Sequence, residues 1–279
     1  MLRQKQIVLG LTLAAAALAT GVMVAAAERP ARILSVCADP DNMPFSNERG
    51  EGFEDKIAAL IAADLHADLQ MTWRSSRRGF LRRTVQSGAC DLVMGVPAGF
   101  PSVASTQPYY RSAYVVVSAK SAHLKISSYD DPALRRLKIG LPALGAEGAN
   151  TPPAAALAKR GVVGNIVGFP VFGDAAGQDP QAKIIDAVAT GEIDAAIVWG
   201  PIGGYYARAY KNALVVAPAP VDAAHPEIAF AYDISLGLEK SQTALRAELD
   251  EILIRRSGEI NAILNEFGVP IVGARAAEK

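Results

Sequence analysis

Residues 33–54 read Ile33-Leu34-Ser35-Val36-Cys37-Ala38-Asp39-Pro40-Asp41-Asn42-Met43-Pro44-Phe45-Ser46-Asn47-Glu48-Arg49-Gly50-Glu51-Gly52-Phe53-Glu54. An apolar run ends in a cluster of turn residues, and a second, glycine-marked turn leads into an amphipathic pattern. This succession predicts a first strand, a loop at its carboxyl end and the first helix of an α/β unit. Ligands of open α/β sheets bind beyond the carboxyl ends of the strands. The loop at 39–45 is therefore a candidate wall of a binding site, and the alternative is a plain strand-to-helix connection.

The strand-and-helix pattern continues through the first third of the chain. Alternating apolar residues predict a strand over 68–74, parallel to the first. A helix opening at Arg77 and running to about Ser87 follows, and then a strand over 92–96. Strand, helix, strand, helix and strand with right-handed crossovers is typical of a doubly wound α/β unit.

The pattern restarts after an extended segment at 113–118 that is rich in tyrosine and valine. The further predicted elements are strands at 138–141, 165–169, 193–199 and 230–238, helices at 154–160 and 180–190, and a helical segment from Gln242 to Phe267 that breaks near Gly258.

The two halves of the chain are similar in plan. Gly88-Ala89-Cys90-Asp91-Leu92-Val93 in the first half is similar to Gly191-Glu192-Ile193-Asp194-Ala195-Ala196 in the second, and each run follows a predicted helix. The extended strands near 113–118 and 230–237 are placed to cross between the halves. The sequence therefore predicts two α/β lobes joined by a two-strand hinge. We assign 28–115 plus 230–279 to lobe 1 and 116–229 to lobe 2.

The first 27 residues differ from the rest. Arg3 and Lys5 precede an apolar run, and Ala25-Ala26-Ala27 has the small residues of a signal-peptidase site. This pattern predicts a cleaved secretory signal at 1–27, which the small-residue end favours over an uncleaved membrane anchor. No later stretch is long and apolar enough to span a bilayer. We therefore expect a periplasmic protein without stable membrane insertion after cleavage.

Charge excludes one class of partner. The formal net charge of the 279-residue chain is +0, and loss of the signal makes it about −2. Because a nucleic-acid-binding surface needs an excess of positive charge, we expect no nucleic-acid partner.

Cys37 and Cys90 are the two cysteines, and export permits a disulfide between them. Cys37 falls near the end of one predicted strand and Cys90 at the start of another, so their sulfurs could lie several residues apart. Since Cα atoms separated by more than about 7 Å cannot be bridged, the pairing stays open. Two cysteines without nearby histidines make a poor metal site, and we expect no metal.

Catalytic residues are not evident. The three histidines, His66, His123 and His225, are scattered, and no Ser/His/Asp set or His-x-x-x-His pair occurs. Glu51 and Glu54 lie at a helix start, where they favour the helix dipole rather than catalysis. We therefore expect no enzyme activity.

Several segments in order resemble one family. They are Val36 to Asn47, Arg77-Arg78-Gly79-Phe80, Cys90 to Pro97, Pro108-Tyr109-Tyr110-Arg111-Ser112, Trp199-Gly200-Pro201 and Gly204-Tyr205-Tyr206-Ala207-Arg208. The plan resembles the type II periplasmic solute-binding proteins, and these segments resemble the MoxJ/XoxJ family within them. The resemblance implies the type II periplasmic-binding-protein fold and an association with quinoprotein methanol dehydrogenases. It does not imply that this chain holds the quinone, so no cofactor is expected.

The resemblance also suggests where a ligand would bind. Amino-acid-binding relatives carry a Thr-x-x-Arg stretch after the third strand, whose arginine clamps the ligand carboxylate. The equivalent stretch here, 95–103, has no arginine, which argues against an amino-acid ligand. Arginines and aromatic residues at strand ends and in their loops remain as candidates. The candidate cleft residues are Asp39, Asn42, Phe45, Arg77, Arg78, Tyr109, Tyr110, Arg111 and Trp199.

Two functions follow as expectations. One is an accessory protein that helps to assemble or activate a pyrroloquinoline-quinone (PQQ)-dependent methanol dehydrogenase, with that dehydrogenase as its partner. The other is the substrate-binding protein of an ABC transporter, with a small polar solute as its ligand. Genes for a quinoprotein dehydrogenase and a cytochrome c beside this gene would favour the first, and genes for a permease and an ATPase the second.

Overall fold

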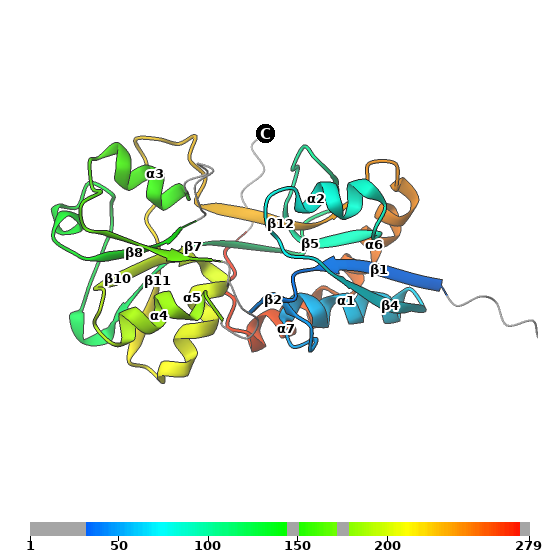
Figure 1. The fold of residues 1–279 in the computed structure, drawn as a ribbon, viewed down its shortest axis with the longest axis horizontal. Helices are drawn as coiled ribbons and strands as arrows, with labels where there is room; N and C mark the ends of the chain where they lie inside the picture. The colour runs from blue at the N-terminus through cyan, green and yellow to red at the C-terminus, as the bar shows by residue number, and fades with distance from the viewer. Residues whose placement is uncertain (1–31, 144–150, 172–178, 274–279) are drawn as a thin grey trace, which may run out of the picture. The chain divides into compact units, whose positions relative to one another are not determined.

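The computed structural model describes residues 32–143, 151–171 and 179–273 (Figure 1). The predicted signal peptide, 1–27, lies outside the described residues. The strands are β1 (Arg32–Ala38), β2 (Asp41–Asn42), β3 (Ser46–Asn47), β4 (Ala67–Trp73), β5 (Leu92–Pro97), β6 (Ala104–Ser105), β7 (Tyr110–Ala119), β8 (Ile139–Ala143), β9 (Ile166–Pro170), β10 (Ala195–Trp199), β11 (Leu214–Pro218) and β12 (Ala231–Leu238). The α-helices are α1 (Phe53–Asp64), α2 (Phe80–Arg83), α3 (Pro152–Lys159), α4 (Ala182–Ala189), α5 (Gly200–Ala207), α6 (Thr243–Arg255) and α7 (Ser257–Glu266). Short 3₁₀ turns are η1 (Val85–Ser87), η2 (Lys120–Ala122), η3 (Pro132–Arg135) and η4 (Arg208–Tyr210).

The main sheet has the strand order β4-β1-β5-β12-β7-β10-β8-β9. We call β1 to β6 with α1, α2, α6 and α7 the first lobe, and β8 to β11 with α3, α4 and α5 the second. Within each lobe the first strands pair in parallel, as the doubly wound plan predicts: β1 with β4 and β5, and β8 with β9 and β10. The fold is therefore the α/β arrangement expected from the sequence, while the residue bounds given above for the lobes stay a prediction.

The first helix starts where the sequence requires it. Gly52 is its N-cap, and the Asp55 carboxylate accepts the Gly52 N–H at 3.0 Å, which is one half of a capping box because glycine has no side chain to supply the other. A Cβ on Gly52 would lie 2.0 Å from the Phe45 carbonyl oxygen, so only glycine allows the loop to pass this close. The helix then buries Phe53 and Ile57 in the core of the first lobe. The loop at 39–47 is thus held against the first turn of α1.

Two strands run between the lobes, as predicted (Figure 1). The first part of β7 pairs antiparallel with β12, and the rest pairs with β10 and β11 of the second lobe. The remainder of β12 pairs with β5 and β6 of the first lobe. β7 therefore belongs to the sheet on both sides of the hinge, while β12 pairs with it and with strands of the first lobe.

The chain also returns to the hinge after α7. Ser112 Oγ donates to the Pro270 carbonyl at 2.6 Å, and the Val272 N–H donates to the Arg111 carbonyl at 3.1 Å. Arg208 of the second lobe donates to the carbonyl of Glu266. We call 268–272 the C-terminal strap, because it ties α7 to β7.

One predicted helix differs from the structure, and several short strands are new. The helix predicted from Arg77 to Ser87 is one turn of α-helix and one of 3₁₀-helix, separated at Thr84. The tail segment breaks at Arg256, close to the predicted position near Gly258. The two-residue strands β2, β3 and β6 and the edge strand β11 were not expected. Within the described ranges, no helix is long and apolar enough to cross a membrane.

Candidate functional site

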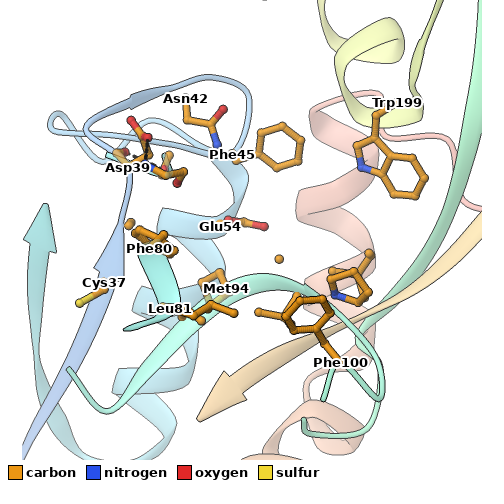
Figure 2. Close-up of a pocket in the computed structure, with 18 of the residues that line it drawn as sticks. Cys37, Asp39, Asn42, Phe45, Glu54, Phe80, Leu81, Met94, Phe100 and Trp199 are labelled. Carbon is orange, nitrogen blue, oxygen red and sulfur yellow. Dashed lines mark hydrogen bonds between the residues drawn. The ribbon is translucent and has the colours of Figure 1, made fainter. Parts of the chain in front are cut away.

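A cavity of about 380 Å³ lies at the carboxyl ends of β1 and β5 (Figure 2). Its volume falls within the range of small-molecule sites, roughly 300–1,000 Å³. The walls come from the loop at 39–47, the α1 start, β5, α2 and the end of β10. The lining residues are Cys37, Ala38, Asp39, Asn42, Phe45, Ser46, Glu54, Ser76, Phe80, Leu81, Val93, Met94, Gly95, Val96, Pro97, Phe100, Tyr110, Trp199 and Ile234.

Asp39 shapes the wall at the end of β1. Its carboxylate accepts the Asp41 N–H at 3.0 Å and the Ser76 N–H at 2.5 Å. Its carbonyl oxygen accepts the Ser46 hydroxyl at 2.8 Å. The side chain is buried, so these bonds satisfy the carboxylate and fix the loop. Asp39 therefore holds the wall in place through the backbone of its neighbours.

Asn42 lines the cavity and joins the two lobes. Gln181, at the start of α4, donates its Nε2 to Asn42 Oδ1 at 2.6 Å. The Tyr206 hydroxyl of α5 donates to the Met43 carbonyl at 2.9 Å and also contacts the Asp179 carboxylate. We call these contacts of the 39–47 loop with the second lobe the latch.

Aromatic rings make up much of the wall. Phe45 belongs to the loop, Phe100 to the segment after β5, and Trp199 to the end of β10 in the second lobe. Figure 2 shows all three around a common space. The ring of Trp199 packs against the ring of Tyr114 on the hinge strand β7, with the ring centroids 5.4 Å apart. Both lobes therefore contribute rings to one cavity.

Glu54 lies among these rings. It is the second residue of α1 and is 8% exposed, and Figure 2 shows its carboxyl directed into the space between Phe45, Phe100 and Trp199. Burial raises its pKa to about 8, the nearby charge of Asp55 adds to the rise, and a hydrogen bond from Tyr109 opposes it. The side chain is therefore an uncharged carboxylic acid at neutral pH.

Two neighbours hold the Glu54 carboxyl. The Tyr109 hydroxyl donates to its Oε1 at 3.4 Å and accepts the Gly95 N–H at 3.2 Å. Gly95 has φ +72°, and a Cβ there would lie 2.5 Å from the same Oε1. A residue with any side chain at 95 would thus displace the carboxyl.

The predicted cations do not reach the cavity wall. Arg77 and Arg78 are exposed and are not among its lining residues. Arg111 is paired with Asp233 at 2.6 Å on the hinge strands. Tyr109 lies behind the wall, where burial raises the pKa of its hydroxyl well above the ordinary value. Among the described residues that line the cavity there is no lysine, arginine or histidine.

The other predicted residues lie at the wall, and their role in binding stays a prediction. Asp39, Asn42, Phe45, Tyr110 and Trp199 line the cavity.

Cys37 and Cys90 form a disulfide, with Cα atoms 5.7 Å apart. Cys90 lies before β5 and not in it, where the Asp91 carboxylate accepts the Ser35 N–H at 2.8 Å. The segment before β5 therefore passes close to β1, which removes the offset between strands that argued against the pairing. Cys37 also lines the cavity, so the bridge supports one of its walls.

Sequence reasoning missed Glu54, Met94, Gly95 and Phe100 as residues of the cavity wall. Glu54 was interpreted as a residue that favours the helix dipole. The position of Glu54 in the chain could have identified it as a wall residue, because the first turn of α1 follows directly from the loop at the carboxyl end of β1. Gly95, inside a strand of apolar residues, also indicated a close approach to another group.

In the part of the chain that the structure describes, no cluster of three or more histidine, cysteine, aspartate or glutamate side chains could hold a metal ion.

Comparisons with known proteins agree on one group. The model of the bacterial extracellular solute-binding proteins, family 3, matches residues 34–270. Protein MoxJ of Methylorubrum extorquens is 31% identical over 91% of this chain and 86% of its own. The crystal structure of the periplasmic binding protein XoxJ from Methylobacterium extorquens AM1 has 33% identity and a TM-score of 0.70, over 86% of this chain and all of that one. The crystal structure of MxaJ from Methlophaga aminisulfidivorans MPT has 24% identity and a TM-score of 0.71, over 86% of this chain and 100% of that chain, and shows the same fold.

Proposed function

Since the chain belongs to the MoxJ/XoxJ proteins within family 3 of the bacterial extracellular solute-binding proteins, we propose that it is a periplasmic accessory factor of a PQQ-dependent methanol dehydrogenase. In this role it holds part of the dehydrogenase in the cleft between its lobes while the enzyme is assembled or activated. The observation that carries the proposal is the match to MoxJ along nearly the whole of both chains.

The charges of the cavity support this function over uptake of amino acids. A free amino acid brings a carboxylate, which needs a cation or several N–H donors once it is buried. The cavity wall offers buried carboxyl groups and aromatic rings instead. A free amino acid would leave its carboxylate without a charged partner there.

Opening of the latch would admit a protein segment to the cavity. Three hydrogen bonds, from Gln181 and Tyr206 to the loop at 42–43, join the lobes at the mouth of the cavity. Each such bond contributes about 1 kcal/mol net, so breaking all three costs about 3 kcal/mol, which the burial of one or two aromatic side chains offsets. A partner that opens the latch gains contact with the rings of Phe45 and Trp199.

A pull-down tests the proposal. The tagged protein is used as bait in the periplasmic fraction of methanol-grown cells, with an amino-acid-binding protein of family 3 as control bait. We expect the methanol dehydrogenase to be recovered with this protein alone. Recovery of no dehydrogenase, together with a clear thermal shift by a free amino acid, would overturn it.

Two variants test whether the cleft makes the contact. Trp199→Ala removes a ring from the cavity wall, whereas Val221→Ala changes an apolar side chain that is 72% exposed and outside that wall. We expect Trp199→Ala to lower the recovery of dehydrogenase several-fold and Val221→Ala to leave it unchanged. Equal recovery with both variants would exclude the cleft as the contact surface.

A second candidate is the delivery of a small solute to an ABC transporter. The cavity favours it, because 380 Å³ suits one small molecule better than a folded segment. Genes for a permease and an ATPase beside this gene, and unchanged growth on methanol after deletion of the gene, would favour this candidate.

A further inference from the structure

The cavity has an unusual balance of polar groups. Its carboxyl groups are those of Asp39 and Glu54, and the Asp39 carboxylate is already bound to two backbone N–H groups. Among the residues that the structure describes, the Glu54 carboxyl has one hydrogen-bond donor, the Tyr109 hydroxyl, at the long distance of 3.4 Å. Its carboxyl therefore has capacity for a further donor, and Figure 2 shows it directed into the open space.

The wall around Glu54 includes several aromatic rings. Phe45, Phe100, Tyr110 and Trp199 line the same cavity. The negative face of an aromatic ring attracts cations, most strongly where water is excluded. An anion would meet these rings and the two carboxyl groups, and none of the described residues that line the cavity carries a positive side chain.

The backbone at Gly95 and the Tyr109 hydroxyl fix the position of the Glu54 carboxyl. Gly95 adopts φ +72° and leaves the space that Oε1 occupies, and its N–H holds the Tyr109 hydroxyl that contacts this oxygen. Three segments distant in sequence thus converge on one carboxyl group. A buried acid supported in this way indicates a site rather than a chance burial.

We propose that the cavity binds a small organic ammonium ion with an apolar body and no carboxylate, with Glu54 as its counter-charge and the rings of Phe45, Phe100 and Trp199 around it. The proposal goes beyond the accessory function and does not depend on it. Asp39 forms another part of the wall, and the ligand's apolar part lies against Met94 and Leu81.

Binding is coupled to a proton. The groups that face Glu54 are Asp55, Tyr109 and Tyr110, and burial keeps both tyrosine hydroxyls neutral. With a pKa of about 8, the empty cavity holds Glu54 as the acid, and an ammonium ion binds its carboxylate. Each binding event therefore releases about one proton from Glu54 to the buffer at neutral pH. The apparent affinity rises as the pH approaches 8, because a larger fraction of the protein is in the binding form.

Isothermal titration of the purified chain tests the proposal with three probes of similar shape: benzylammonium, benzyl alcohol and benzoate. We expect benzylammonium to bind at least about tenfold more tightly than benzyl alcohol, and benzoate not to bind. Its affinity should rise by about tenfold or more between about pH 6.5 and pH 8.5. The binding heats measured in phosphate and in Tris buffer should differ by the difference between the two ionisation enthalpies, because the buffer takes up about one proton per ligand bound.

Variants assign the effect to Glu54. Glu54→Gln should lower the benzylammonium affinity by about tenfold or more, remove its pH dependence and leave benzyl alcohol unaffected. Glu51→Gln is the matched control, since Glu51 lies three residues away and pairs with Arg49 on the surface. It should leave all three affinities unchanged.

Four results would overturn the proposal: no heat with any probe, equal affinity for the alcohol, preferred binding of benzoate, or an affinity that falls as the pH rises. The pH profile and the proton count use the wild-type chain, so they decide the question even if Glu54→Gln does not fold. Recovery of the dehydrogenase in the pull-down is measured separately, so either proposal can fail alone.

Discussion

Glu54 and Asp55 are adjacent buried carboxyl groups with different surroundings. Asp55 caps the start of α1 by accepting the N–H groups of Asn47 and Gly52, yet burial still raises its pKa to about 6. Glu54 has the Tyr109 hydroxyl as its donor, and its pKa rises to about 8. Both folded-state values lie above the unfolded ones, so both groups favour folding most when they are protonated.

Stability should therefore fall as the pH rises. Between the unfolded pKa of 4.5 and the folded value of about 8, the folded protein holds a proton on Glu54 that the unfolded chain has lost. This group alone lowers the free energy of unfolding by up to about 5 kcal/mol across that interval. Urea unfolding at about pH 5.5 and pH 8.5 measures it. Glu54→Gln should flatten the profile, leaving the smaller slope from Asp55, and an unaltered slope would contradict the assignment.

Gly95 should be sensitive to substitution because of its positive φ and because of its contact with Glu54. Comparison with Gly99 isolates the effect of the contact. Gly95→Ala places a Cβ 2.5 Å from Glu54 Oε1 at a positive φ, whereas Gly99→Ala meets the same backbone strain at φ +74° with no atom within 4 Å. The strain costs about 1 kcal/mol in each case. We expect Gly95→Ala to lower the free energy of unfolding by at least about 1 kcal/mol more than Gly99→Ala. Equal losses would mean that Glu54 moves away freely.

For single residues, the sequence predicted part of the cavity wall but not which charged or titratable side chains lie in it. Asp39, Asn42 and Phe45 could be placed near a site, because they follow the first strand directly. Arg77 and Arg78 follow the neighbouring strand in the same way, yet their exposed side chains do not line the cavity. A position along the chain does not tell which way a long side chain extends. The raised pKa of Glu54 depends on the contact of three separate segments, which no local pattern reveals.

Among the elements, the disulfide joins β1 to the segment before β5 and closes a loop of 53 residues. The loop entropy that it removes from the unfolded chain corresponds to roughly 4 kcal/mol at most. The double variant Cys37→Ser/Cys90→Ser should lose about 2–4 kcal/mol in urea unfolding. The wild type should show the same loss under reductant and the variant none. A wild type indifferent to reductant would argue against the bridge.

The predictions of helices and strands were correct where the hydrophobic periodicity was strong, and they missed elements that are short or weakly patterned. Ile184, Ile185 and Val188 point inward from α4, as their spacing predicts. The edge strand β11 has half-buried and exposed residues in no strict alternation and ends at Pro218, so its strand pattern is weak. Its pairing with β7 arises from a contact distant in sequence. Such strands are decided by tertiary contacts rather than by local preference.

For the whole molecule, the latch predicts how the lobes respond to single changes. Tyr206→Phe removes the hydroxyl that bonds the Met43 carbonyl, while Tyr205→Phe alters a neighbouring ring that stacks on Phe267 at 5.7 Å. We expect Tyr206→Phe to increase the radius of gyration in solution scattering and to lower the free energy of unfolding by about 1 kcal/mol. Tyr205→Phe should leave the radius unchanged. An identical radius for Tyr206→Phe and the wild type would show that this bond does not hold the lobes together.

The two lobes differ in how their cores are assembled from the chain. The buried cluster of the first lobe combines residues between Leu34 and Tyr110 with residues between Ile234 and Val269. The clusters of the second lobe come from residues between Val115 and Phe230. During synthesis from the N-terminus the second lobe can therefore collapse from one continuous piece, whereas the first must wait for α6 and α7. The cavity wall at β1 is among the first segments to be made and among the last to be enclosed, so it stays open to misassembly for longer than the second lobe.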